Sequence, residues 1–439
     1  MPPIADPLRF QPAARTLAAV LHAFDELGEG GGGVVGAERR RLALDAYLHA
    51  GPERPAPIAG WRHPYAALPF RDLTWSTGRV NVPAGPGAGA AGLVHLGAVH
   101  LAPDRRAGDP RITIGSLADA RRADPARIDA LLGSIVAPEA DRFVALATAF
   151  QNCGAYVEVP AGVVLDAPIQ LVWSTRPGET GAVFPHTLLR LGAGAQATVY
   201  ERRLGEGDAF VAGIVEADLG PGARLDYVVI QTADDGARVV VHRAARCAAG
   251  ATAAWHVADL GAALARSTIA VELAGDRAAS EVNALFFARG FQHADLAVRA
   301  HHDAAATESR AIVRGAATER GRGRIRGDIA IGGGCDRSSA TFRAAGLLLS
   351  RDASLDVTPA LEIASDRVSA FHAATIGSLD EEHLFYVQSR GITRRVAERM
   401  MALAFCEAAI AGFPGDALRD EVRTLLDERL DDVPDTFAS

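Results

Sequence analysis

Short apolar runs separated by glycine-containing turns dominate the chain from about residue 143 onward. Segments such as AYVEVPAGVVL, APIQLVW and TLLRLGAGAQATVYERR are rich in Val, Leu and Ala and contain Gly or Pro at their turns. Runs of this kind are typical of β-strands, and convincing amphipathic helices are missing over about 230 residues. The pattern therefore predicts a mainly β core.

An internal repeat runs through this core. LGAGA begins at Leu191, LGPGA at Leu219 and CAAGA at Cys247, 28 residues apart each time. Further on, LSRDASLD from Leu349 echoes LGPGARLD. A fixed period of about 20 to 50 residues is the mark of a solenoid, and strands between the turns indicate a β-helix or a related array of stacked strands. Chance recurrence of Gly-Ala in an Ala- and Gly-rich chain is the alternative.

The N-terminal part shows helical patterns instead. Residues 11–27 and 37–50 are predicted to form helices joined by the Gly-rich linker 28–36. Residues 51–140 are rich in Pro and Gly, with one helix expected around 124–135. Three regions result, an N-terminal helical and mixed region, a β-helix core and a C-terminal helical region, at 1–140, 141–378 and 379–439.

The C-terminal region begins a second helical pattern. TRRVAERMMALAFCEAAI places Val396, Met400, Leu403 and Ala404 on one side of a helix, and DALRDEVRTLLDERL predicts another. Such a helical appendage is expected either to cap the open edge of the solenoid or to dock a partner.

Composition narrows the range of functions. The 439 residues are 49% hydrophobic and 22% charged, as in a globular protein, and the net charge of -8 argues against broad nucleic-acid binding. All 45 basic residues are Arg. Without Lys, the chain has neither the lysine of a P-loop ATPase nor the amine of a Schiff-base enzyme.

Cysteine spacing and the N-terminus indicate a cytoplasmic protein. Cys153, Cys247, Cys335 and Cys406 form no C-x-x-C pair, so no zinc ribbon, ferredoxin-type site or disulfide framework is expected. The N-terminal residues lack the basic start and apolar run of a signal peptide, and no stretch of roughly 20 apolar residues indicates a membrane span.

The most specific segment is 347–392, LLLSRDASLDVTPALEIASDRVSAFHAATIGSLDEEHLFYVQSRGI. It resembles the core signature of the SufB/SufD family, the scaffold proteins of SUF-type iron–sulfur cluster assembly, and its details resemble the SufD branch. Segments 142–173 and 290–303 are similar to the opening and the central QH-x-D…H part of the family's β-helix. The WRH triplet at 61–63 is a poor echo of a SufD W-K-Y-T motif. The resemblance covers roughly residues 140–412.

The resemblance implies a right-handed parallel β-helix flanked by helical N- and C-terminal regions. It implies a non-catalytic scaffold subunit that pairs with a SufB-like paralogue and works with SufC, an ABC-type ATPase that supplies ATP hydrolysis. In the family the C-terminal helices dock SufC, which assigns that role here to about 393–430. The β-helices pair near their C-terminal strands, where the cluster is thought to form. The expected cargo is a transient iron or iron–sulfur cluster that this chain alone does not hold stably, and a homodimer stays open.

His372, in FHAATIG, falls on the SufD histidine of the family, which implies a ligand for nascent cluster or iron at the SufB interface. A neutral imidazole is a good iron ligand, and Ala373 and Ala374 leave room for one. A packed or solvent-facing histidine without a ligand is the alternative. Ala370 stands where many SufD chains have Cys, and Phe371 precedes the histidine where SufB proteins carry Glu residues beside it.

Cys335 is the second candidate. It lies in IGGGCDRSS, a turn that suits a partly exposed thiol and hence a transient iron or sulfur contact. A small residue at a corner of the solenoid is the alternative. Cys247 and Cys406 are expected to pack as small hydrophobic residues.

By residue type alone, the histidines and aspartates between residues 293 and 303 could form a metal site. Strand alternation places His293 and Asp295 on one face but His301 and His302 on opposite faces, so at most one of that pair joins them. Polar ladders on a solenoid surface explain the same residues.

Two charged runs each have a structural and a functional interpretation. In RGRGRIRGD, Arg320, Arg322, Arg324 and Arg326 share one strand face, either as a basic stripe that steers an acidic or phosphate-bearing partner or as a solvated face balanced by acids. The DEE run at 380–382 is interpreted as the first turn of a helix rather than a paired-carboxylate site.

Two other classes of function stay open. A β-helix lyase or hydrolase of carbohydrates would show aromatic-lined grooves, although the aromatic content is 6%. A self-associating structural solenoid would assemble without partners. Metal identity, cluster type, stoichiometry, sulfur donor and flavin involvement do not follow from the sequence.

Overall fold

The computed structural model describes residues 35–49, 92–96, 99–104, 111–175, 182–205 and 207–432. The predicted helix at 11–27 and the WRH triplet lie outside these residues. The described chain is mainly β, with 46% strand against 24% helix, and forms a parallel β-solenoid of about seven turns. The predicted fold class is confirmed.

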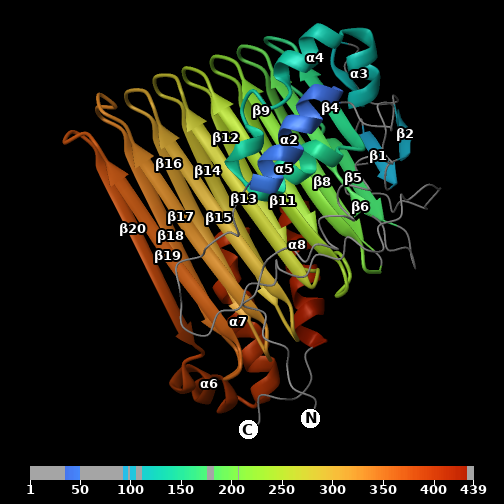
Figure 1. The fold of residues 1–439 in the computed structure, drawn as a ribbon. Coiled ribbons are helices and arrows are strands. Elements are labelled where there is room, and N and C mark those ends of the chain that lie inside the picture. The colour runs from blue at the N-terminus through green and yellow to red at the C-terminus, as the bar shows by residue number, and fades with distance from the viewer. Residues whose placement is uncertain are drawn as a thin grey trace.

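Two sheets face each other across the core (Figure 1). Sheet 1 has the order β2 (Val99–Asp104), β1 (Gly92–Leu96), β5 (Ile169–Thr175), β8 (Gln196–Gly205), β10 (Arg224–Gln231), β12 (Thr252–Asp259), β14 (Ala279–Ala288), β16 (Glu308–Ala317), β18 (Ser339–Leu348) and β20 (Ser369–Ser378). Sheet 2 has the order β19 (Ser354–Ile363), β17 (Arg322–Ile331), β15 (His293–His302), β13 (Leu264–Leu273), β11 (Arg238–Cys247), β9 (Phe210–Leu219), β7 (Pro185–Leu191), β4 (Cys153–Val159) and β3 (Thr113–Ser116), with β6 (Ala182–Val183) paired to β9.

From β7 onward successive strands alternate between the sheets, so each strand pairs in parallel with the strand two further along the chain. The N-terminal strands differ from this pattern, because β1 pairs with β2, and β3 with β4, in antiparallel fashion. Sequence patterns had placed no strand before residue 140. Here β1 pairs with β5 in parallel, so the 92–104 segment extends sheet 1.

The 28-residue repeat is one turn of the solenoid. Leu191, Leu219 and Cys247 are register partners at the ends of β7, β9 and β11. In the turns that follow, the N–H of Gly194 donates to Pro221 O at 2.8 Å and that of Gly222 donates to Ala249 O at 2.9 Å. Both glycines have φ of 67°, the left-handed region that glycine enters without steric cost. Chance recurrence is thereby excluded.

The predicted repeat of LGPGARLD by LSRDASLD is wrong, because the two segments do not lie at the same position of the coil. The turn after Leu349 leads from β18 in sheet 1 to β19 in sheet 2. The turn after Leu219 leads from sheet 2 to sheet 1, at the opposite side of the coil. Similar turn residues recur on both sides because both turns reverse a strand.

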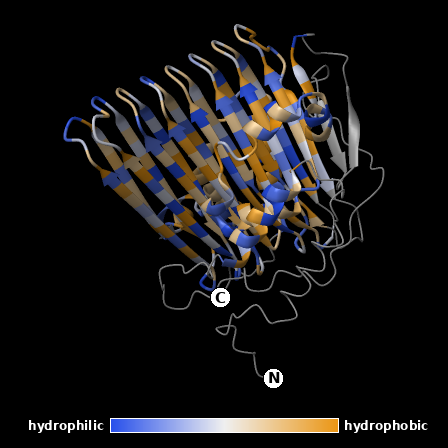
Figure 2. Ribbon diagram, turned by 45° about the horizontal axis from the view of Figure 1, so that its top comes forward, coloured by the Kyte–Doolittle hydropathy of each residue, from blue (hydrophilic) through white to orange (hydrophobic). Residues whose placement is uncertain are grey.

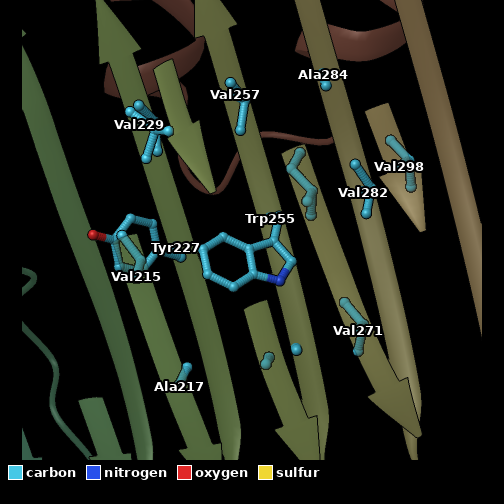
Figure 3. Packing of buried hydrophobic residues seen from close by; sticks show 14 of the residues in the cluster. Val215, Ala217, Tyr227, Val229, Trp255, Val257, Val271, Val282, Ala284 and Val298 are labelled. Carbon is cyan, nitrogen blue, oxygen red and sulfur yellow. The ribbon is translucent and has the colours of Figure 1, made fainter. Parts of the chain in front are cut away.

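The main core lies between the two sheets. Hydrophobic and hydrophilic residues alternate along the strands, as a two-faced strand requires (Figure 2). Trp255 and Tyr227 project from sheet 1 with ring centroids 4.9 Å apart, near small residues such as Val215 and Ala217 of sheet 2 (Figure 3). Large rings from one sheet therefore fill the space that small side chains leave on the other.

Helices pack against part of the outer face of each sheet. α2 (Ala37–His49) and α5 (Arg142–Phe150) lie on sheet 2. Close to them lie the helices that connect them along the chain, α3 (Leu117–Ala123), α4 (Pro125–Leu131) and η4 (Pro138–Ala140). On sheet 1 lie α7 (Arg394–Ile410) and α8 (Asp416–Asp431), preceded by α6 (Glu381–Gln388). Figure 1 shows α2 and α5 in front of the sheets and α7 and α8 behind them. The C-terminal helices thus pack on a face of the solenoid, and do not cap its edge.

Two helix predictions are confirmed in part. The helix at 37–50 corresponds to α2, and the helix at 124–135 to α4, whose N-cap is Asp124 and which ends before Gly133 with its φ of 64°. The predicted apolar side of α7 is wrong. Val396 and Met400 are 46% and 49% exposed, because small residues at 397, 402, 406 and 409 face sheet 1 and allow close approach.

Candidate functional site at the open end of the solenoid

The last turn leaves both sheets with an open edge. Among the described strands, β20 pairs with β18 alone and β19 pairs with β17 alone. Each is ten residues long. A long edge strand offers a row of unpaired backbone groups to another chain, a hazard that monomeric proteins usually blunt. The end of the solenoid is therefore a surface suited to strand pairing.

His372 lies on the inward-facing side of this last turn. In the β18–β20 register, His372 is the partner of Phe342, which is 1% exposed and belongs to the core. A Cβ at Gly327 of sheet 2 would meet the Phe342 ring, and the register partner of Gly327 on β19 is Pro359. In the last turn, His372 and Pro359 therefore occupy the positions that Phe342 and Gly327 occupy one turn earlier. His372 is exposed because no further turn covers it.

Apolar side chains surround the histidine at this end. Leu355, Val357 and Leu361 of β19 pack against the core and remain half-buried. Ile363 and Ile376 are 43% and 44% exposed. These residues continue the core to the solvent boundary, and exposed apolar surface of this kind marks an interaction site.

His372 is a single imidazole. Within the described part of the chain, no group of three or more His, Cys, Asp and Glu residues is arranged to hold a metal ion. An iron or cluster bound at His372 would take its other ligands from a second chain. Its binding role stays a prediction.

Cys335 is not the exposed thiol that its turn indicated. It is 2% exposed, packs in the core and donates through Sγ to His302 O at 3.1 Å. Burial, aided by Asp303, raises the pKa of the Cys335 thiol, which disfavours the thiolate that binds metals. An iron contact at Cys335 stays a prediction, and its geometry is that of a packing residue.

The remaining cysteines also pack. Cys247 and Cys406 are 0% and 1% exposed, and burial raises the pKa of each to about 12. The prediction that both act as small hydrophobic residues is confirmed.

The histidines near residue 300 obey the predicted alternation. His302 faces the interior, where its ring nitrogens contact Thr307 Oγ1 at 2.7 Å and Ser309 Oγ at 2.8 Å. His301 faces outward, 3.3 Å from Asp303. The two side chains therefore lie on opposite sides of sheet 2.

The arginine stripe is balanced by acids. Arg320 precedes β17, and its guanidinium lies 5.5 Å from the Phe291 ring centroid. Arg324 is 3.2 Å from Asp356, and Arg326 is 3.5 Å from Asp295. Two of these arginines therefore pair with acids on neighbouring strands, as the structural interpretation predicted.

The acidic run at 380–382 opens α6. The Asp380 carboxylate accepts from the N–H groups of Glu382 at 2.9 Å and His383 at 3.4 Å. Glu381 pairs with Arg394 of α7 at 2.7 Å. The predicted start of a helix at residues 380–382 is confirmed, with Asp380 as its N-cap and Glu381 and Glu382 in its first turn.

The outer sides of α6 and α7 expose large apolar residues. Phe385 and Tyr386 of α6 are 72% and 56% exposed, and Val396 and Met400 of α7 are nearly half exposed. We call these four residues the α6–α7 apolar set. α7 packs on sheet 1 and α6 contacts α7, so the exposure of these side chains makes the α6–α7 apolar set a candidate docking surface.

Sequence patterns missed a buried charged group inside the solenoid. Glu201 and Arg203 on β8 face inward with exposures of 0% and 4%, and Arg243 on β11 is 1% exposed. Arg203 Nε and the Tyr227 hydroxyl both donate to Glu201, while Arg243 lies 3.7 Å from it. Burial opposes ionisation of Glu201, but the two guanidinium groups outweigh it and lower its pKa. Charged residues at alternate positions of β8, on the face that points into the core, are the sequence signal that could have identified this group.

The fold and its open end define a class of protein: a two-sheet parallel β-solenoid with helices on both outer faces and an uncapped last turn. None of the described helices is long and apolar enough to cross a membrane.

The comparisons with known proteins identify the family. Residues 174–405 match the family described as SUF system FeS cluster assembly, SufBD core domain, and residues 103–171 match the SufBD protein N-terminal region. The chain belongs to the SufB/SufD family of iron–sulfur cluster assembly proteins.

Relatives with this description come from several bacteria. An iron-sulfur cluster assembly SufBD family protein of Mycobacterium leprae is 28% identical over 277 residues, 62% of this chain and 32% of that protein. SufD of Escherichia coli is 27% identical over 244 residues, 55% of this chain and 58% of SufD. SufB of Bacillus subtilis is 25% identical over 281 residues, 62% of this chain and 59% of SufB. The chain thus matches about a third of the mycobacterial relative and under two thirds of the other two.

Proposed function

We propose that this chain is a non-catalytic scaffold subunit that pairs, through β19 and β20, with a SufB-like partner in a SUF complex. The observation that carries the proposal is the open last turn, where two ten-residue edge strands and a continuation of the core face solvent. A second solenoid of the same spacing would extend both sheets and bury that surface. Relatives named SufB and SufD support a partner from the same family.

His372 is the proposed contribution of this chain to cluster formation at that junction. Its inward position places the imidazole between the two sheets, where a partner's last turn would meet it. A neutral imidazole binds iron well, and flanking Ala373 and Ala374 add little bulk. The iron or nascent cluster is cargo that passes through the junction in the cytoplasm.

The α6–α7 apolar set is the proposed dock for a SufC-like ATPase. The chain has no Lys and therefore no P-loop of its own, so nucleotide hydrolysis must come from a partner. An exposed aromatic pair with nearby aliphatic residues is the composition that interface hot spots favour. Docking there leaves the solenoid end free for the paralogue.

The surface gives little support to a carbohydrate enzyme. Two hollows on the described surface, with volumes of about 660 and 650 Å³, are lined by charged, small and aliphatic residues. Neither lining includes Phe, Tyr or Trp, the residues on which sugar rings stack.

Co-expression with the host's SufB-like and SufC-like proteins tests the proposal, followed by size-exclusion chromatography and iron analysis of the peak. We expect the wild-type chain to co-elute with both partners. Ile376→Glu at the open end should release the SufB-like protein alone, and Met400→Glu on α7 should release the ATPase alone. Phe291→Glu, at a turn residue that is 82% exposed, is the matched control and should release neither.

His372→Ala separates assembly from iron handling. This variant should retain both partners and carry less iron per complex, because it removes a ligand from an exposed position without disturbing packing. Unchanged iron loading would remove His372 from the proposed role. Elution of the wild-type chain as a homodimer that ignores both partners would overturn the scaffold assignment and favour self-association through the same edges.

A further inference from the structure

Three arginines cluster on the outer face of sheet 1 near the open end. Arg310 and Arg314 lie on β16 and Arg343 lies on β18, where its register partner is Ile312, midway between the other two. Arg310 and Arg343 are exposed, and Arg314 is half-buried. We call these three residues the end arginine cluster. Their neighbours along the chain belong to the core, namely Ala311, Val313, Phe342 and Ala344.

The end arginine cluster forms no ion pair within the described part of the chain. Glu281 and Glu308 flank Arg310 on its side away from β18, and the Glu281 carboxylate accepts from Asn283 Nδ2 at 2.9 Å. Arg343 has no acid among its register neighbours, which are Ile312 on β16 and Ala373 on β20. The positive charge nearest the open edge is therefore uncompensated.

Outward arginines in earlier turns of sheet 1 are paired instead. Arg202 of β8 lies 3.2 Å from Glu421 of α8, and Arg224 of β10 lies 2.9 Å from Asp226. Among the described strands of sheet 1, the unpaired outward guanidinium groups are thus gathered beside the open edge, although the whole chain carries a net charge of -8.

Two aromatic rings border the end arginine cluster. The guanidinium carbon of Arg343 lies 5.1 Å from the ring centroid of Phe371 on β20, and that of Arg314 lies 5.6 Å from the ring centroid of Phe405 on α7. Such contacts attract a guanidinium and restrict its motion. Burial lowers the pKa of Arg314, and the charge of Arg343 lowers it further, so the cluster holds like charges that repel one another.

Arg343 can reach past the edge strand. Its register neighbour on β20 is Ala373, whose methyl group leaves room on the outer face. A strand added beside β20 would lie about 10 Å from β18, because neighbouring strands are about 5 Å apart. An extended arginine and an extended glutamate together span that distance. The guanidinium is thus within reach of the chain that continues sheet 1.

We propose that the end arginine cluster receives an acidic segment of the SufB-like partner on the outer face of sheet 1, with Arg343 as its main contact. The inference rests on the proposed pairing through β19 and β20. A protein segment fits better than a small anion, because the cluster lies on an open sheet face and neither hollow on the described surface includes these arginines in its lining.

The two sheets carry opposite charges at the open end, which gives this contact a role in orientation. On the edge strand of sheet 2, Glu362 is exposed on the outer face. A partner turned the other way would bring its acidic segment against this like charge. The cluster therefore selects which sheet of the partner continues sheet 1.

The absence of lysine permits a direct test by cross-linking. Arg343→Lys gives the chain a single side-chain amine, which a carbodiimide joins to a carboxylate in contact with it as an amide, while the carbodiimide takes up the water. Arg322→Lys is the matched control, because Arg322 is also exposed, lies one strand inside the edge of sheet 2 and has the small Ser354 as its register neighbour on β19.

Mass spectrometry of the cross-linked complex reads out the contact. A peptide joining position 343 to an Asp or Glu of the SufB-like protein is expected, with none from position 322. Links between lysines of the partner and acids of this chain should be equal in both variants and serve as the internal standard. A link from position 343 to the ATPase instead, or equal linking from both positions, would contradict the proposal.

Charge reversal measures the contribution to binding. Arg343→Glu should slow association with the SufB-like protein by about tenfold at low salt, an effect that fades as salt rises. Arg343→Lys and Arg322→Glu should stay within about twofold of wild type. A wild-type chain that does not bind the SufB-like protein would overturn the proposed function together with this inference. Binding with an unchanged rate in Arg343→Glu would overturn the inference alone.

Discussion

The middle turns of the solenoid and its last turn use the same repeat but differ in what lies beside them. In the middle, Val229, Trp255 and Val257 are 0% exposed because a neighbouring turn covers each side. In the last turn, the inward-facing Leu355 and Val357 are half-buried and His372 is exposed. The comparison teaches that the same strand pattern leaves an exposed, partly apolar surface at the end of the solenoid, because no further turn covers it.

The two regions also treat polar groups differently. The middle turns hold Glu201, Arg203 and Arg243 inside the coil, where each carboxylate or guanidinium is stabilised by another charge. The last turn holds one exposed imidazole, and among the described residues no group of three or more His, Cys, Asp and Glu side chains could hold a metal ion. The charges of the first region are buried and paired with one another, whereas the imidazole of the second is exposed.

Truncation of the central tryptophan should have the largest effect. Trp255→Ala removes a fully buried ring that contacts Tyr227 and leaves a cavity, at an expected cost of about 4–5 kcal/mol. Phe371→Ala, which removes a ring that is 49% exposed on β20, should cost below about 1 kcal/mol. Urea unfolding of both variants measures the difference. Equal losses would mean that the last turn is as tightly packed as the middle.

Removal of the internal carboxylate charge should come next. Glu201→Gln leaves Arg203 and Arg243 buried without a full counter-charge, which should destabilise the chain by about 3–4 kcal/mol. Glu362→Gln on the exposed side of β19 is the control and should lie within about 0.5 kcal/mol of wild type. A neutral outcome at Glu201 would show that the interior is hydrated enough to screen both guanidinium groups.

The buried side chain of His302 should make the stability of the chain depend on pH. Burial lowers the pKa of His302 to about 4 from its ordinary 6.5, so between these values the unfolded chain binds a proton that the folded chain does not. This contribution is fully present above pH 6.5 and is lost as the pH falls toward 4, by about 1–3 kcal/mol in total. His302→Gln should reduce the slope of unfolding free energy against pH over that window and leave the part that His242 contributes, since burial also lowers the pKa of His242 to about 4. An unchanged slope in His302→Gln would contradict the contribution assigned to His302.

The smallest effect on stability is expected at His372. His372→Ala removes an exposed side chain with no hydrogen bond within the chain described here, so the free energy of unfolding should change by less than about 0.5 kcal/mol. Thermal or urea unfolding of the isolated chain measures it. A larger loss would mean that the imidazole packs as part of the core.

Local patterns predicted part of this structure and misassigned other parts for identifiable reasons. The step from Leu191 to Leu219 to Cys247 located the turns, because each turn must place small residues or glycine at the same point of the coil. The start of a helix at residues 380–382 followed from adjacent residues alone. The apolar side of α7 was wrong because helical periodicity identifies large apolar residues, whereas close packing on sheet 1 selected small ones. The burial of Cys335 agrees with the alternative of a small residue at a corner of the solenoid, and its thiol donates to His302 O, which is far away along the chain.

The sequence by itself determined the repeat, the alternation of inward and outward residues and the family, since all three depend on neighbours along the chain. The tertiary structure alone decided that Glu201, Arg203 and Arg243 meet in the interior, because their strands belong to opposite sheets. It also decided that His372 stands at an uncovered end opposite Pro359, because that position depends on the register of β20 with β18 and of β19 with β17. Contacts between strands many residues apart follow from the stacking of the coil, which no local pattern contains.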